Sequence, residues 1–236
     1  MKIDSQFMIE TFWIALSGVP VTLQLTFGSL MMAIPPAFFM AVGKMNKVKG
    51  VQQAVSVYVS LIRGTPVVLQ ILFFYSLLPS FLNHIFLGLH LNIDIFAVPP
   101  ILYAYIVFTL NTIATLTEVF RSALSTVNKG QLEAAQAVGL TQIQAYRRII
   151  IPQAFVVALP NLCNVTVNLL KGTSLAFLMT VKEVTALAKL EASYGYNYIE
   201  AYLDIFIIYI ILCTMVQFLF RLIEKYGSSF KKGLAT

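Results

Sequence analysis

The chain has 236 residues, of which 58% are hydrophobic and only 11% are charged, and its mean hydropathy is +0.82. A soluble domain of this size needs many more charged side chains to cover its surface, so most of this surface must face lipid. The net charge of +6 comes from basic residues scattered over loops, and not from one aromatic-laced basic face, so nucleic acid is not expected as a partner. The composition excludes an ordinary soluble domain and predicts a membrane protein.

Five apolar segments are long enough to cross a bilayer, since a hydrocarbon core of about 30 Å takes roughly 20 helical residues. Their approximate limits are 16–43, 52–79, 99–124, 153–178 and 201–222. Each is too long for a strand, and none shows the alternation of a barrel strand. Residues 5–17, which include Trp13, predict a further helix lying in the outer membrane interface. We expect an all-α polytopic membrane protein that forms a single domain over residues 1–236.

The basic residues favour alternate sides of the five spans. They fall between the first two spans, around the third connection, and after the last span: Lys44, Lys47, Lys49, Arg121, Lys129, Arg147, Arg148, Arg221, Lys225, Lys231 and Lys232. The loop 80–98 has no Lys or Arg, and near 180–200 two lysines are balanced by three glutamates. The positive-inside rule therefore predicts an N-terminus outside and a C-terminus in the cytoplasm.

The longest polar stretch covers about residues 125–150, on the cytoplasmic side in this topology. Residues 131–138 are rich in good helix formers, and Gly139 can end that helix in a left-handed conformation. Thr141, with Gln144 three residues later, can cap a second helix. A short helix across a loop suits docking onto another protein, but an ordinary solvated hairpin has the same pattern. The residues alone leave these two interpretations open.

A motif in this stretch resembles the EAA loop of ABC importer permeases. The family pattern is EAA, three residues, Gly, nine residues, Ile, any residue, Leu and Pro. The matching residues here are Glu133, Ala134, Ala135, Gly139, Ile149, Ile151 in place of the Leu, and Pro152. The resemblance implies a type I ABC importer permease fold and a loop that couples to a separate ATPase subunit. Glu133, Ala134 and Ala135 would meet that subunit, and Gly139 would provide the turn.

Three more segments resemble the permeases of the polar amino-acid uptake family. They are the RGTP segment at 58–66 followed by Gln70, the LKGTSL stretch at 170–175, and Glu118-Val119-Phe120-Arg121. The resemblance covers nearly the whole chain and is greatest to permeases for cystine and related amino acids. It implies import of L-cystine or a related amino acid, with a glutamine, histidine or arginine system as the alternative.

Arg63 lies about 11 residues into the second predicted span, which is roughly 17 Å along a helix and close to the bilayer midplane. Gly64, Thr65 and Pro66 can open the helix there, and broken helices at the midplane are where transporters bind ionic substrates. Arg63 therefore either contacts the α-carboxylate of an amino acid or holds the broken helix together. Gly64 and Thr65, with the hydroxyls of Thr173 and Ser174, complete the candidate substrate site.

Glu118 and Arg121 are three residues apart and share a helix face near the cytoplasmic end of their span. A structural pair or an inner gate is the expected role. Neither a metal site nor a cofactor is expected, and the chain has no ATP-binding G-x-x-x-x-G-K-[S/T] motif, so ATP would bind to a partner and this chain would not be an enzyme.

The expected complex in the cell membrane contains this permease, a second permease chain that is identical or paralogous, an ATP-binding ABC subunit and an extracellular or periplasmic substrate-binding protein. An ion-coupled secondary transporter is the competing hypothesis. It is disfavoured because five spans without an internal repeat are too few for the usual transporter folds.

Overall fold

The computed structural model of the chain describes residues 4–91 and 94–233, with side chains described as far as residue 226. The regular elements of this part of the chain are all helices. Five stretches in it are long and apolar enough to cross a membrane: Ser5–Met45, Val67–Gly88, Pro100–Ser125, Gln142–Met179 and Tyr198–Tyr226. An all-helical chain with five candidate spans is therefore confirmed, although several limits differ from those expected.

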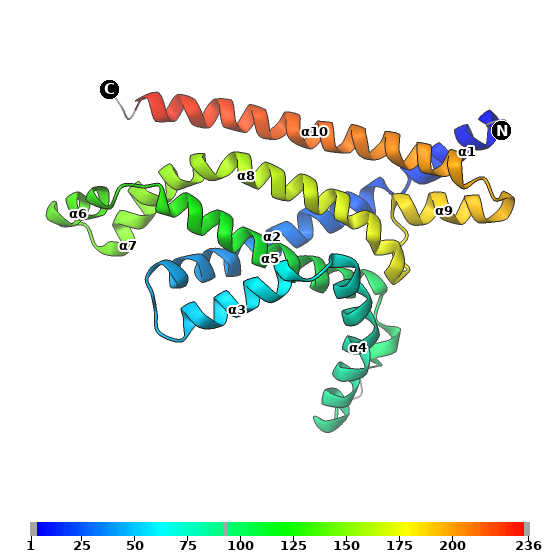
Figure 1. Ribbon diagram of the computed structural model, residues 1–236, viewed down its shortest axis with the longest axis horizontal. Coiled ribbons are helices and arrows are strands. Elements are labelled where there is room, and N and C mark those ends of the chain that lie inside the picture. Colours follow the sequence, from blue (N-terminus) through cyan, green and yellow to red (C-terminus); the bar gives the residue numbers. More distant parts are fainter. Residues whose placement is uncertain (1–3, 92–93, 234–236) are drawn as a thin grey trace.

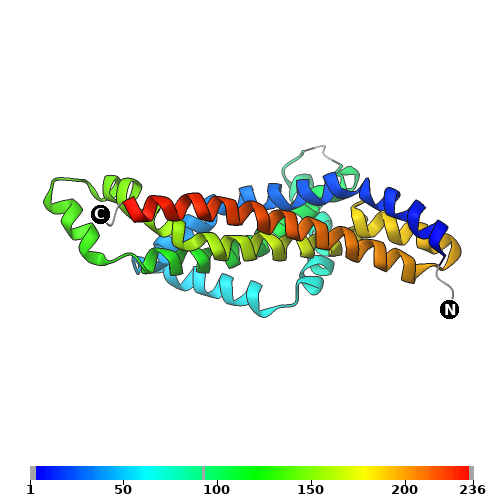
Figure 2. The same cartoon turned by 90° about the horizontal axis from the view of Figure 1, so that it is seen from above.

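Four long helices run side by side along the longest axis of the molecule (Figures 1 and 2). They are α2 (Val19–Met45), α5 (Pro100–Ser125), α8 (Ile151–Gly172) and α10 (Tyr198–Gly233). At one end of this bundle lie α1 (Ser5–Leu16) and α9 (Val184–Gly195), and at the other lie α6 (Lys129–Ala137) and α7 (Gln142–Ala145). The two ends of the bundle are therefore formed by different short helices.

Small residues allow α2 and α5 to form the centre of the bundle. Ser29, Ala33, Ala37 and Ala41 are fully buried and follow one another at intervals of four, so they form a smooth stripe on α2. Larger side chains of α5, such as Phe108, are buried in the same core cluster. Small side chains at this spacing allow α2 and α5 to approach each other closely.

The N-terminal stretch consists of two helices. The expected helix at 5–17 is α1, which begins after Asp4, whose carboxylate accepts hydrogen bonds from the backbone N–H groups of Gln6 and Phe7. A turn at Ser17 and Gly18 separates it from α2. α1 packs against α9 and α10. Its location in the membrane interface stays a prediction.

The second expected span, 52–79, is wrong as a continuous helix. The chain forms α3 (Val51–Gly64) and α4 (Val67–Gly88), with Thr65 in an extended conformation between them. Thr65 precedes Pro66, and the proline ring disfavours a helical conformation of the residue before it. Figure 1 shows α3 lying along the bundle and α4 leaving it at a steep angle. The predicted opening at Gly64-Thr65-Pro66 is therefore present, but it separates two helices.

The fourth span and the loop after it also differ from expectation. A short π-helix (η2, Tyr146–Ile150) leads into α8, and a 3-10 helix (η3, Thr173–Met179) replaces the last turns of the expected span 153–178. Thr180 then adopts a left-handed conformation with φ +58°. The loop near 180–200, expected only as a connection with balanced charges, contains α9. The connection between α4 and α5 includes a short 3-10 helix (η1, Ile95–Ala97).

Candidate functional site

The break between α3 and α4 is held by two polar side chains. The last carbonyls of α3 have no partner inside their own helix. Thr65 Oγ1 donates to Leu61 O at 2.9 Å, and Gln70 Nε2 donates to Ile62 O at 2.6 Å. The same Gln70 nitrogen lies 3.0 Å from Thr65 O and 2.8 Å from Thr65 Oγ1. The break is therefore a defined structure with satisfied carbonyls.

Arg63 is the second-last residue of α3 and is exposed. Within the described parts of the chain it has no recorded hydrogen bond or ion pair, so this chain alone does not seal it against backbone carbonyls. A Cβ built on the next residue, Gly64, meets no atom within 4 Å, so the space beside the break is open. The negative end of the α3 dipole is a favourable place for a cation.

Thr173 and Ser174 lie at the start of η3 and use their hydroxyls locally. Thr173 Oγ1 is buried and donates to Leu170 O at 2.6 Å, and Ser174 Oγ donates to Lys171 O at 2.7 Å. No hydrogen bond joins them to Arg63, Gly64 or Thr65 in the described structure. The α3–α4 break and the junction between α8 and η3 are connected instead by the packing of α4 against η3.

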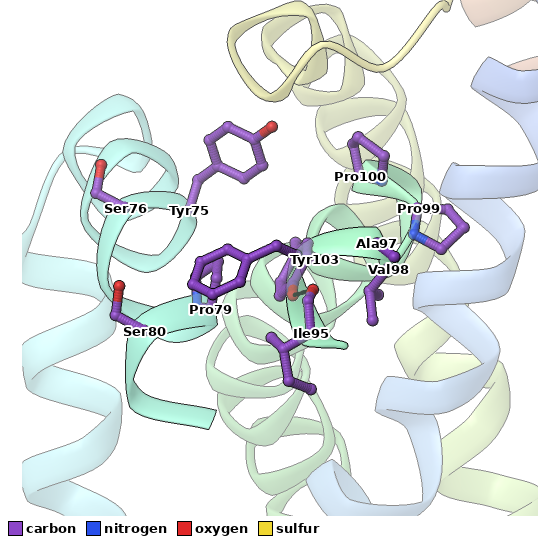
Figure 3. A pocket seen from close by; sticks show the side chains of 11 residues that line it. Tyr75, Ser76, Pro79, Ser80, Ile95, Ala97, Val98, Pro99, Pro100 and Tyr103 are labelled. Carbon is purple, nitrogen blue, oxygen red and sulfur yellow. Dashed lines mark hydrogen bonds between the residues drawn. The ribbon is translucent and has the colours of Figure 1, made fainter. Parts of the chain in front are cut away.

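A cavity of about 400 Å³ opens beside α4, a feature that the sequence did not predict as a site. Figure 3 shows side chains of α4 on one side and those of α5 and the preceding segment on the other. Its lining residues are Tyr75, Ser76, Pro79, Ser80, Ile95, Phe96, Ala97, Val98, Pro99, Pro100 and Tyr103. The rings of Tyr75 and Tyr103 meet edge to face with their centroids 6.2 Å apart. The hydroxyls of Tyr75 and Thr180 lie 3.4 Å apart and so connect this wall to η3.

The loop between α5 and α8 forms the short helices that its composition predicts. Asn128 caps α6, and Gly139 follows that helix in a left-handed conformation with φ +87°. Thr141 and Gln144 form a capping box at the start of α7, each side chain bonding the other residue's backbone N–H. These contacts stiffen a loop of about 25 residues into a compact projection at the end of the bundle (Figure 2).

The EAA residues of this loop differ in exposure. Glu133 and Ala134 are exposed, but Ala135 is 3% exposed and faces inward, where α6 packs on α7 and η2. Ala135 therefore packs inside the loop, and the expectation that these small residues allow close approach of an ATPase subunit stays a prediction. Two apolar side chains that the motif does not include, Val138 and Ile143, are 79% and 80% exposed on either side of Gly139.

Glu118 bridges two cations near the end of α5. Its Oε2 accepts from Arg121 Nε at 2.9 Å, and its Oε1 accepts from Lys44 Nζ at 2.6 Å. The three side chains are partly buried, which strengthens their attraction relative to a fully solvated pair. From the sequence, Lys44 predicts only topology, because its place at the end of α2 does not indicate that α2 and α5 converge there.

Glu183 is a fully buried carboxylate between η3 and α9. It caps α9 by accepting from the N–H groups of Thr185 and Ala186, and Tyr209 donates its hydroxyl to it at 3.1 Å. Burial raises the pKa of Glu183 from 4.5 to about 7, although these hydrogen bonds favour the ionised form. From the sequence, Glu183 is only one of three glutamates that balance two lysines near 180–200, and its burial is not predicted.

Residues 33–226 match the model of a family described as the binding-protein-dependent transport system inner membrane component. The match covers most of the chain, including the α3–α4 break, the junction between α8 and η3, and the loop between α5 and α8. The chain belongs to this family, and it is a multi-pass, non-catalytic component of an inner-membrane ABC transporter. This membership implies an ATPase partner and decides against an ion-coupled secondary transporter.

The relatives place the chain among amino-acid permeases. It is 36% identical to the probable amino-acid permease protein YxeN of Bacillus subtilis (strain 168), over 94% of this chain and 95% of that protein. It is 32% identical to the L-cystine transport system permease protein TcyL of the same organism, over 88% of this chain and 84% of the relative. It is 34% identical to the octopine transport system permease protein OccM of Rhizobium radiobacter, over 95% and 90%. The chain is therefore the permease subunit of an ABC amino-acid importer.

Solved structures support the same architecture. A crystal structure of an amino acid ABC transporter with histidines matches with a TM-score of 0.78 and 29% identity, covering 96% of this chain and all of that one. An inward-facing MetNI methionine ABC transporter matches with a TM-score of 0.70 and 18% identity, covering 91% and 96%, which supports the fold alone. The type I ABC importer permease fold is thus confirmed.

Proposed function

We propose that this permease imports L-cystine or a related amino acid, with its N-terminus outside and its C-terminus in the cytoplasm. The relative that transports L-cystine supports this choice of substrate, and the basic residues of alternate loops support the orientation. A glutamine, histidine or arginine system is the second candidate, because one matching structure is an amino acid ABC transporter with histidines.

The loop between α5 and α8 is the docking element for the ATPase subunit in this proposal. The observation that carries it is the pair of exposed apolar side chains, Val138 and Ile143, beside the left-handed Gly139 on a stiff projection. Exposed apolar side chains on a compact projection are typical of a surface that another protein covers. Glu133 and Ala134 are exposed on the same loop.

Arg63 is the substrate contact in this proposal, with Gly64 and Thr65 beside it and Thr173 and Ser174 on the neighbouring broken helix. The exposed guanidinium beside an open break supports this role. A guanidinium stays charged and can bind both oxygens of a carboxylate. A second permease chain, identical or paralogous, would enclose this region, and an external substrate-binding protein would deliver the amino acid.

ATP-dependent uptake by the reconstituted complex tests the choice of substrate. The complex and its binding protein are placed in proteoliposomes and supplied with labelled L-cystine, glutamine, histidine or arginine. We expect the highest uptake for L-cystine. A preference for one of the other three would overturn the cystine assignment and leave the amino-acid permease intact.

A further inference from the structure

Gln70 is a buried amide in the first turn of α4 that connects three parts of the chain. It is 6% exposed. Its Nε2 reaches Ile62 O, Thr65 O and Thr65 Oγ1 at 2.6, 3.0 and 2.8 Å, so its two hydrogens are shared among one acceptor in the last turn of α3 and two on Thr65 in the break. One side chain of α4 thereby holds the last turn of α3.

The other end of the same amide is held by α5. Asn111 Nδ2 donates to Gln70 Oε1 at 3.1 Å. One residue earlier, Leu110 O accepts a hydrogen bond of 2.6 Å from the hydroxyl of Tyr58, which belongs to α3. Both helices that flank the break are therefore tied to the same turn of α5.

We propose that Gln70, together with Asn111, is a positioning pair that sets the opening of the α3–α4 break relative to α5. The pair thereby orients Arg63, and this part rests on the proposed role of Arg63 in binding substrate. The hydrogen bonds reach the carbonyl directly before Arg63, so a change at Gln70 moves the end of α3 that carries the guanidinium. A direct contact between Gln70 and the substrate is not part of the proposal.

The position of Asn111 gives the pair a second consequence. Asn111 lies 14 residues before the end of α5 at Ser125, which is about 21 Å along the helix, and the ATPase-docking loop begins there. A displacement of that loop that moves α5 along its axis also moves Asn111. The Gln70–Asn111 hydrogen bond would pass this movement to the break.

Two substitutions separate positioning from simple stabilisation. Gln70→Met keeps the length of the side chain and removes all of its hydrogen bonds. Asn111→Ala leaves Gln70 bonded to α3 and removes only the tie to α5. Gln53→Leu is the matched control, since Gln53 is an exposed amide on α3 whose side chain makes no hydrogen bond to the described residues.

Each variant is purified as the complete complex, reconstituted with the binding protein, and assayed for amino acid imported per ATP hydrolysed. We expect this ratio to fall at least tenfold for Gln70→Met, which loses several hydrogen bonds, and about threefold for Asn111→Ala, which loses one. It should stay unchanged for Gln53→Leu. Each lost hydrogen bond corresponds to a factor of about three to ten. A purely stabilising role would lower uptake and ATP hydrolysis in proportion. An unchanged ratio in both variants would overturn the proposal.

A distance measurement tests the opening without any substrate. Spin labels are placed on cysteines at Val57 of α3 and Leu77 of α4, both exposed, with Cys163 and Cys213 changed to serine. We expect the distance distribution to broaden in Gln70→Met, and an unaltered distribution would contradict the proposal. Arg63→Ala in the uptake assay separates the two claims. Normal uptake by Arg63→Ala would refute the proposed role of Arg63. If Arg63→Ala instead loses uptake, while the Gln70 and Asn111 variants import as much amino acid per ATP as wild type, only the positioning pair is refuted.

Discussion

Gly18 lies directly against the backbone of Glu183, although the two residues are far apart in the sequence. A Cβ built on Gly18 would come within 2.6 Å of the Glu183 carbonyl carbon and of the Val184 nitrogen. Real Cβ atoms do not approach backbone this closely, so the turn between α1 and α2 touches the start of α9 only because residue 18 has no side chain. The N-terminal helix and the buried carboxylate are thus parts of one packed unit.

We expect Gly18→Ala to destabilise the permease by about 1–3 kcal/mol, because the new methyl group meets rigid backbone and forces α9 away. Thermal unfolding of the purified complex measures the effect. Gly88→Ala is the control, since a Cβ on Gly88 meets no atom within 4 Å. Equal melting temperatures for the two variants would show that the contact can relax without cost.

Glu183 predicts a pH dependence of stability. Its pKa of about 7 in the folded protein lies above the ordinary value of 4.5, so the folded state holds the proton more tightly than the unfolded state. Its contribution is therefore fully present below pH 4.5 and is lost as the pH rises through about 7, by an amount of the order of 3 kcal/mol. We expect the melting temperature of wild type to fall between pH 5 and 8 more steeply than that of Glu183→Gln. Parallel curves for the two proteins would contradict this.

Gly139→Val tests the docking loop. Gly139 has φ +87°, a region that a β-branched residue resists, so the substitution should distort the turn between α6 and α7. We expect the variant to reach the membrane and to hydrolyse ATP, with uptake per ATP reduced at least tenfold. Gly130→Ala is a matched control in the same loop, because its new Cβ makes only an ordinary contact of 3.4 Å. Transport at the wild-type rate would refute the coupling role of Gly139.

Arg63 gives a graded prediction. Arg63→Lys keeps the charge but loses the two-pronged geometry, so we expect uptake to fall about tenfold with assembly intact. Arg63→Ala should abolish uptake while ATP hydrolysis persists. Loss of assembly and ATP hydrolysis together in the alanine variant would indicate that Arg63 holds the broken helix and does not bind substrate.

A double-mutant cycle decides whether the Lys44–Glu118–Arg121 group has a structural role or acts as an inner gate. We expect Lys44→Met and Glu118→Gln to couple by about 1 kcal/mol in the free energy of unfolding, as partly buried charges in contact do. This outcome defines a structural group. An inner gate would behave differently: the same variants would raise basal ATP hydrolysis without a change in melting temperature.

Much of this permease is determined by local sequence. Five apolar stretches need lipid because so few charged residues are available to cover them, and the EAA spacing together with Gly139 and the Thr141–Gln144 box specifies the loop. The break at Thr65 is equally local, since a residue before proline avoids the helical region whatever surrounds it. Each of these features depends on residues that are close together in the sequence, from neighbouring residues at the break to about 20 residues in an apolar stretch or in the EAA pattern.

Other features needed the tertiary structure. That the break makes two helices, that Gln70 reaches back across it, and that Asn111 and Lys44 meet partners on other helices could not be inferred from spacing. These contacts join residues 41 and 74 positions apart, and their formation depends on how α2 and α4 pack against α5. The burial of Glu183 follows from the same cause. Its sequence neighbours carry balanced charges and do not predict burial, whereas in the folded chain Gly18 lies against its backbone and Tyr209 donates to its carboxylate. Local sequence therefore determined the class of protein and the approximate position of the five apolar stretches, whereas the three-dimensional packing decided where several helices begin and end and which polar side chains meet inside it.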